Sequence, residues 1–228
     1  EALELRDGDK AIYMGKSVYD AVNNINSTIK SSIINQSFEQ DTLDELLINL
    51  DGTENKKNLG ANAILAVSLA FAHAKAKALN IPLYKTFDEE AGLSLPVPMM
   101  NIINGGAHAN NDLDFQEFMI LPIGFNSFSD SLRAGVEIFH TLKNTLNKKS
   151  LATSVGDEGG FAPNISSNNE ALEVILDSIE KAGYKSGEEV YLGLDVASSE
   201  FYKDGSYTMS DGNSYDSKGF CAYLESLC

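Results

Sequence analysis

The chain has 228 residues, of which 43% are hydrophobic and 22% are charged, as is usual for a globular protein. Its net charge of −16 argues against nucleic acid or an anionic membrane as its main partner. Only two arginines, Arg6 and Arg133, are present. An anionic substrate would therefore need lysines, helix N-termini or divalent cations to offset the field of the protein.

The two cysteines, Cys221 and Cys228, do not make a disulfide framework, which favours a reducing cytoplasm. No apolar run in the sequence approaches the length of a membrane span. The composition therefore favours a cytoplasmic protein.

The first part of the chain, residues 1–91, is predicted to be mainly helical. Apolar residues recur at helical spacing over 16–32 and 41–50, and an alanine-rich stretch covers 58–80. Asp41 is the expected N-cap of the second helix. A Pro- and Gly-containing segment follows, and we place a domain boundary near residue 92.

Beyond that boundary, predicted strands and helices alternate over residues 92–228. Strands are expected at 97–103, 115–121, 152–155 and 190–196, and helices at 129–148, 168–182 and 216–227. The first two strands lie too close for a crossover helix, so they should pair antiparallel. The later strands have such helices and should be parallel. The pattern predicts an α/β fold whose second domain contributes four strands.

Polar residues stand at the ends of these four strands. His108 follows the first strand, Gln116 and Glu117 begin the second, Glu158 follows Asp157 after the third, and Asp195 ends the fourth. A charge in an apolar strand is costly unless it is paired or binds metal, which singles out Glu117 and Asp195.

Simpler interpretations of these residues stay open. Glu117 could face solvent from an edge strand, Asp195 could cap the following turn, and His108 could be a surface-loop histidine. If the strand ends converge, two neighbouring glutamates would share a proton and one could act as an acid. An aspartate oxygen suits Mg²⁺. Acid and metal together suit the removal of hydroxide from a negatively charged carbon skeleton.

Three segments carry a closer resemblance, and they occur in the order VPMMNIINGGAHANNDLDFQEFMILP, TSVGDEGGFAPN and YLGLDVASSEFY. They closely resemble the enolase family, as do the N-terminal segments EALELRDGD and LDGTENKKNLGANAILAVSLA. The resemblance covers essentially the whole chain. It implies the helical part of a smaller α+β domain at 1–91, followed at 92–228 by the first half of a modified eight-stranded TIM barrel.

The resemblance also implies an activity, that of a hydro-lyase of glycolysis and gluconeogenesis. Enolases interconvert 2-phosphoglycerate and phosphoenolpyruvate with two Mg²⁺ ions. Glu158 would be the general acid, and Glu117 would help to hold its proton and to orient the substrate hydroxyl. His108 would lie in a mobile loop near the substrate phosphate, with Gln116 in the same pocket. Asp195 would be one of three carboxylate ligands of Mg²⁺.

Relative to the family pattern, the sequence lacks the opening strands, the lysine base and two metal carboxylates. We therefore expect an internal part of an enolase that is inactive alone. The resemblance implies a homodimer or an octamer of dimers, in the cytoplasm, with further occurrence at the cell surface or by secretion without a signal peptide. The alternatives are another superfamily enzyme acting on a carboxylate substrate, or a non-catalytic role in binding plasminogen or the RNA degradosome.

Overall fold

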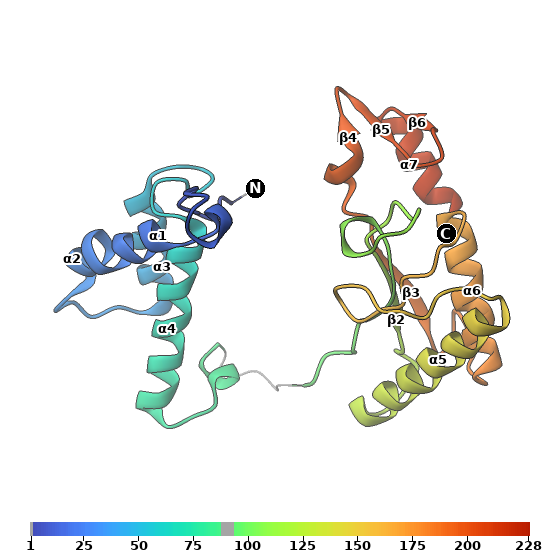
Figure 1. Ribbon diagram of the computed structural model, residues 1–228. Helices are drawn as coiled ribbons and strands as arrows, with labels where there is room; N and C mark the ends of the chain where they lie inside the picture. Colours follow the sequence, from blue (N-terminus) through green and yellow to red (C-terminus); the bar gives the residue numbers. More distant parts are fainter. Residues whose placement is uncertain (1, 88–93) are drawn as a thin grey trace. The chain divides into compact units, whose positions relative to one another are not determined.

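The computed structural model describes residues 2–87 and 94–228 (Figure 1). The chain divides into two compact units, Glu1–Leu93 and Ser94–Cys228, called here the N-terminal and C-terminal units. The domain boundary predicted near residue 92 lies outside the described residues. Among the helices of the described residues, none is both long and apolar enough to cross a membrane.

The N-terminal unit is mainly helical in its described part, as predicted. Its helical segments are η1 (Tyr13–Gly15), α1 (Tyr19–Asn24), the π-helical η2 (Ile25–Ile29), α2 (Lys30–Ile33), α3 (Gln40–Asp51), α4 (Ala61–Leu79) and η3 (Leu83–Thr86). Their apolar faces meet in a core formed by Ala21, Ile29, Leu43, Leu47, Leu59, Ala63 and Ile64.

Two helix starts differ from the sequence-based expectation. Helix α3 begins one residue before Asp41, and its N-cap is Glu39, whose backbone N–H donates to Thr42 Oγ1 at 3.1 Å. The assignment of Asp41 as N-cap was therefore wrong, because Glu39 is the residue with extended backbone angles. Helix α4 begins at Ala61 rather than at 58, since Gly60 has a φ of +93° that no helix accommodates.

The C-terminal unit is built on a three-stranded sheet in the order β1-β2-β3. Its strands are β1 (Met100–Asn104), β2 (Glu117–Leu121) and β3 (Tyr191–Asp195). The antiparallel pairing of the first two strands is confirmed. The expectation that later strands are parallel was wrong for β3, which pairs antiparallel with β2. Strands β1 and β3 do run the same way, but the reversed β2 lies between them.

The predicted strand at 152–155 does not form. Val155 makes a single antiparallel bridge to Phe161, and Phe161 makes a single parallel bridge to Ile103 of β1. A tight turn explains this, because Gly156 N–H donates to the Gly160 carbonyl at 2.8 Å and reverses the chain after one paired residue. The sheet of the described residues is open and does not close into a barrel.

Two helices, α5 (Phe128–Lys148) and α6 (Asn168–Lys181), cover one face of this sheet (Figure 1). On β2, Phe118 and Ile120 are fully buried and alternate with the partly exposed Glu117 and Met119. The two buried side chains share a core with Ile138, Leu142, Leu146, Ile175 and Ile179 of the helices. Side chains alternate between the faces of a strand, so Glu117 points to the face opposite the helices.

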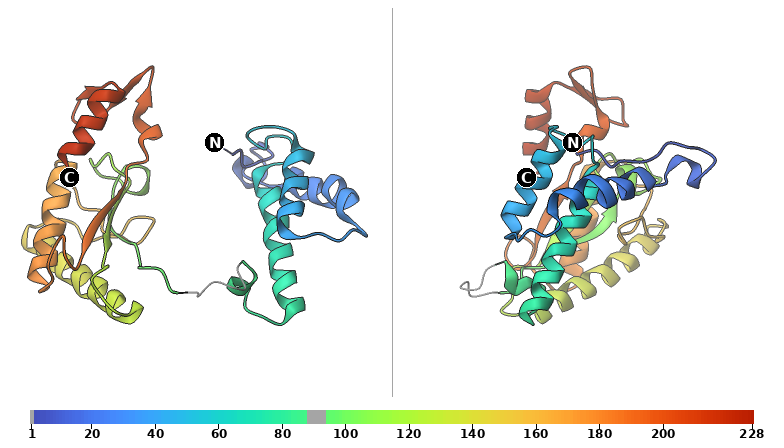
Figure 2. Two further views of the ribbon diagram at one scale, coloured as in Figure 1. Left: turned by 180° about the vertical axis from the view of Figure 1, so that it is seen from behind. Right: turned by 90° about the vertical axis from the view of Figure 1, so that its left-hand side faces the viewer.

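A smaller sheet completes the unit at the end away from α5 (Figure 2). It consists of β4 (Tyr202–Lys203), β5 (Ser206–Thr208) and β6 (Ser214–Tyr215), with helix α7 (Ser217–Ser226) packed against it. Two short 3₁₀ segments, η4 (Gly106–His108) and η5 (Ser198–Phe201), follow β1 and β3.

Candidate active site

The candidate site lies at one edge of the main sheet, where three polar residues stand in register. Asn104 at the end of β1 pairs with Glu117 at the start of β2, and Glu117 pairs with Asp195 at the end of β3. The reversed direction of β2 puts its first residue beside the last residues of its neighbours. Directly paired residues project to the same face, so these three side chains are neighbours on the face away from the helices.

His108 lies between two carboxylates. Its Nδ1 is 3.7 Å from Glu117 Oε1, and its Nε2 is 4.0 Å from Glu158 Oε1. Gln116 Nε2 lies 2.6 Å from His108 Nε2, and an amide nitrogen can only donate, so this imidazole nitrogen accepts. His108 Nδ1, on the side of Glu117, is buried and has no hydrogen-bond partner among the described residues.

The turn that carries Glu158 is fastened to the loop that carries His108. Asp157 N–H donates to the His108 carbonyl at 3.1 Å. Glycines allow this approach, because a Cβ on Gly156 would lie 2.6 Å from the His108 carbonyl oxygen. A Cβ on Gly160 would meet the Asn104 side chain and would lie 2.9 Å from the Ile102 carbonyl carbon. The sequence GDEGG therefore packs directly over the end of β1.

Asp195 makes a local hydrogen bond in addition to its strand pairing with Glu117. Its Oδ1 accepts the Ala197 N–H at 3.0 Å, so the simpler interpretation of Asp195 as a cap of the following turn describes a real contact. Asp195 also pairs directly with Glu117 and is exposed, so its second carboxylate oxygen is available on the polar edge. The structure thus places all five predicted residues at one end of the sheet.

Comparison with models of protein families covers nearly the whole chain. Residues 1–87 match the model described as enolase, N-terminal domain, and residues 92–225 match the model described as enolase, C-terminal TIM barrel domain. The chain belongs to the enolase family. This is a family of lyases whose members typically use Mg²⁺, and the mixed helix-and-strand units agree with it.

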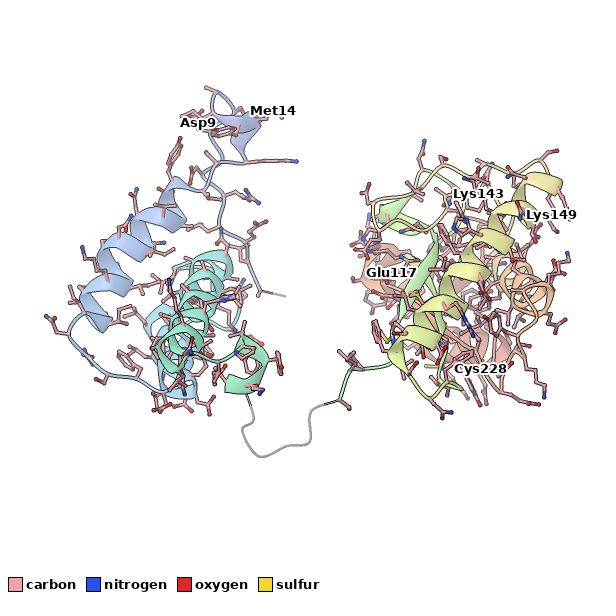
Figure 3. The ribbon with its side chains drawn as sticks, turned by 90° about the horizontal axis from the view of Figure 1, so that it is seen from below. Asp9, Met14, Glu117, Lys143, Lys149 and Cys228 are labelled. Carbon is pink, nitrogen blue, oxygen red and sulfur yellow. The ribbon has the colours of Figure 1, made fainter. Side chains whose placement is uncertain are left out.

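In this enolase-family chain, Glu117 and Glu158 differ in how far their side chains are exposed to solvent. The Glu117 side chain is 16% exposed and the Glu158 side chain 48%. Burial, followed by the negative charges of Glu158 and Asp195, raises the pKa of Glu117 above its usual range, and His108 opposes this. Figure 3 shows the labelled Lys143 and Lys149 away from Glu117. Glu117 is thus a carboxyl group whose surroundings disfavour its charged form.

The donor atoms fit a magnesium site only in part. His108, Glu117 and Glu158 bring one ligand atom each within 4.8 Å of one another, and this group contains a histidine. Mg²⁺ prefers six oxygen ligands, so this trio has the composition of an acid–base cluster rather than of a magnesium cage. Asp195, paired with Glu117 in the sheet, presents a carboxylate oxygen, which is the type of donor atom that Mg²⁺ prefers.

Two asparagines at this edge were not predicted. Asn104 is fully buried, and within the described residues its Oδ1 and Nδ2 have no hydrogen-bond partner. Asn111 lies in the His108 loop, and its side-chain amide donates hydrogen bonds to the end of β1 and to the segment that follows the Glu158 turn. The polar Asn104 within the apolar run MNIIN could have been singled out by the reasoning applied to Glu117. The contacts of Asn111 have no sequence signal, because they depend on how two loops meet.

Proposed function

We propose that the protein containing this chain catalyses the reversible dehydration of 2-phosphoglycerate to phosphoenolpyruvate with Mg²⁺. One observation carries the proposal, namely the convergence of His108, Glu117 and Glu158 at the sheet edge that also bears Asp195. Family membership alone indicates a lyase. A paired acid beside a hard metal ligand favours the loss of hydroxide from a phosphorylated hydroxy acid.

The chain's own residues act on the leaving group. Glu117 and Glu158 share a proton, and the half-exposed Glu158 presents it to the hydroxyl at carbon 3 of the substrate. When a base removes the proton at carbon 2, the C–O bond breaks, Glu158 protonates the departing oxygen, and water leaves with formation of the C=C bond. His108 and Gln116 bind and orient the substrate. Mg²⁺, when bound, offsets the negative charge that develops on the substrate carboxylate.

Other parts of this site are proposed to come from residues outside the sequence. These are the lysine that acts as the base and two further carboxylates that join Asp195 around Mg²⁺. A homodimer, or an octamer built from dimers, and a cytoplasmic location stay predictions from the resemblance. The same holds for the alternative roles with plasminogen or the RNA degradosome.

The substitution Glu158→Gln in the whole protein tests the proposal. It keeps the shape of the side chain and removes its proton, so kcat should fall by about 10²–10⁴-fold, the usual range for a lost general acid. Phosphoenolpyruvate formation is followed by its ultraviolet absorbance. Glu173→Gln is the control, since Glu173 is an exposed residue on α6. Near-normal turnover of the Glu158 variant would show that the assigned role is wrong.

A further inference from the structure

We propose that Asn111 is a positioning residue that clamps the loop of His108 to the loop of Glu158. Asn111 touches neither predicted catalytic side chain, and the resemblance assigns it no role. The proposal deepens the proposed function, on which it rests, because it concerns how Glu158 is placed for proton transfer.

Both hydrogens of the Asn111 amide bridge separate segments. Nδ2 donates to the Asn104 carbonyl at 2.9 Å and to the Pro163 carbonyl at 3.0 Å. Its Oδ1 accepts the Leu113 N–H at 3.3 Å, which orients the side chain within its own loop. A primary amide has two donor hydrogens, so both donors of this side chain are used. The geometry is that of a three-point clamp.

The clamp ties together the elements that carry the site. Asn104 ends β1 and stands in register with Glu117, while Pro163 follows the GDEGG turn. Backbone bonds join the same segments at three further points. Asn104 N–H donates to the Phe161 carbonyl at 2.8 Å, Phe161 N–H to the Ile102 carbonyl at 2.9 Å, and Asp157 N–H to the His108 carbonyl. Asn111 lies midway along the His108 loop, and its bonds hold the middle of that loop against the end of β1 and the segment after the GDEGG turn.

The clamp matters for Glu158 because the neighbours of its side chain, His108 and Glu117, stand on the loop and the strand across from the Glu158 turn. Glu158 is 48% exposed at the tip of a turn and lies 4.0 Å from His108 Nε2. Its position is therefore set by the backbone of the turn and by the way the turn is held against the His108 loop. Displacement of a proton donor by about 1 Å can cost about 10²-fold in rate.

The first test uses the 228-residue chain and two matched variants. Asn111→Asp keeps the shape but sets a carboxylate oxygen against two carbonyls, and Asn110→Asp makes the same change at the exposed neighbouring residue. We expect the Asp157 amide to exchange with solvent at least about tenfold faster in Asn111→Asp, with no change in the amides of β2 or in Asn110→Asp. Exchange within about twofold of the wild-type rate, or equal acceleration in both variants, would overturn the proposal.

The wild-type chain provides a second readout if Asn111→Asp does not fold. Both side-chain amide hydrogens of Asn111 should be protected from exchange, whereas those of Asn110 should exchange freely. Equal exchange of the two side chains would mean that the clamp does not form.

The second test separates positioning from substrate binding in the whole protein. Asn111→Asp should lower kcat by about 10–100-fold and change the KM for 2-phosphoglycerate by less than about threefold, because placement of the proton donor affects the transition state. Asn110→Asp should match the wild type. A raised KM with unchanged kcat would overturn the positioning role. If the wild-type protein has no turnover, the proposed function fails, and the exchange measurements still decide whether the clamp exists.

Discussion

Glu117 is the residue whose surroundings most clearly distinguish it from an ordinary carboxylate. It lies on β2 with two negatively charged neighbours, Glu158 in the opposing turn and Asp195 in the adjacent strand. Its burial and these charges raise its pKa, while His108 at 3.7 Å gives partial relief. The folded protein therefore holds the proton of Glu117 more tightly than the unfolded chain does.

Because the pKa of Glu117 is higher in the folded protein than in the unfolded chain, this group makes the folded protein less stable at high pH. A carboxyl group whose pKa rises on folding costs no stability below its ordinary value of 4.5, and it lowers stability as the pH rises from there through its folded pKa. Glu117→Gln removes the charge and should therefore melt at a higher temperature than the wild type at pH 8. At pH 4 the two proteins should melt at nearly the same temperature. Thermal unfolding followed by circular dichroism at both pH values measures this.

Glu173→Gln serves as the control for this experiment, because Glu173 is exposed and its substitution should leave the pH dependence unchanged. A Glu117→Gln variant that is less stable than the wild type at pH 8 would mean that the carboxylate is stabilised by its neighbours rather than strained by them.

At the scale of elements, the direction of β2 decides which residues meet. Because β2 runs against β1 and β3, its first residue reaches the edge where they end. The GDEGG turn reaches the same edge because its glycines leave room for β1 beneath it. The site therefore depends on one reversed strand and one closely packed turn.

The contact beneath this turn can be tested at Gly160. Gly160→Ala would place a Cβ 2.9 Å from the Ile102 carbonyl carbon and 3.0 Å from the Ile103 nitrogen, backbone atoms that cannot move aside. We expect a loss of about 1–3 kcal/mol in the free energy of unfolding, typical of overpacking. Urea unfolding of the 228-residue chain measures the change.

Gly159→Asn is the matched comparison in the same turn. Gly159 has a φ of +83° and nothing within 4 Å of an added Cβ, and asparagine tolerates a left-handed backbone. This variant should lie within about 0.5 kcal/mol of the wild type. Similar losses for the two variants would show that the turn does not pack closely on β1.

At the scale of the whole molecule, the candidate site belongs to the C-terminal unit alone. All five predicted residues lie between residues 108 and 195, within Ser94–Cys228. Asp195 is the one metal carboxylate that the resemblance implies within this sequence. Activity is therefore proposed for the whole protein rather than for these 228 residues.

This leads to a prediction for the isolated chain. The purified 228-residue chain should not convert 2-phosphoglycerate, and it should bind Mg²⁺ only weakly, because one carboxylate with water ligands holds this ion poorly without substrate phosphate. Calorimetric titration with Mg²⁺ and the phosphoenolpyruvate assay measure the two properties. Turnover by the isolated chain comparable to that of the whole protein would refute the proposal that the base and two metal carboxylates come from other residues.

The sequence by itself determined the helical N-terminal unit, the alternating second part, and the candidate residues Glu117 and Asp195. Apolar periodicity and the cost of a charge in an apolar strand are local properties that a sequence displays. It also predicted the antiparallel pairing of the first two strands, since a short connection leaves no room for a crossover helix.

Only the tertiary structure decided the rest. The antiparallel pairing of β3, the single bridge at Val155 and the two hydrogen bonds that Asn111 donates depend on segments that are distant along the chain. The raised pKa of Glu117 likewise follows from charges that come from another strand and another turn. Hydrogen-bond partners and local fields are set by distance in space, and spacing along the chain does not specify them.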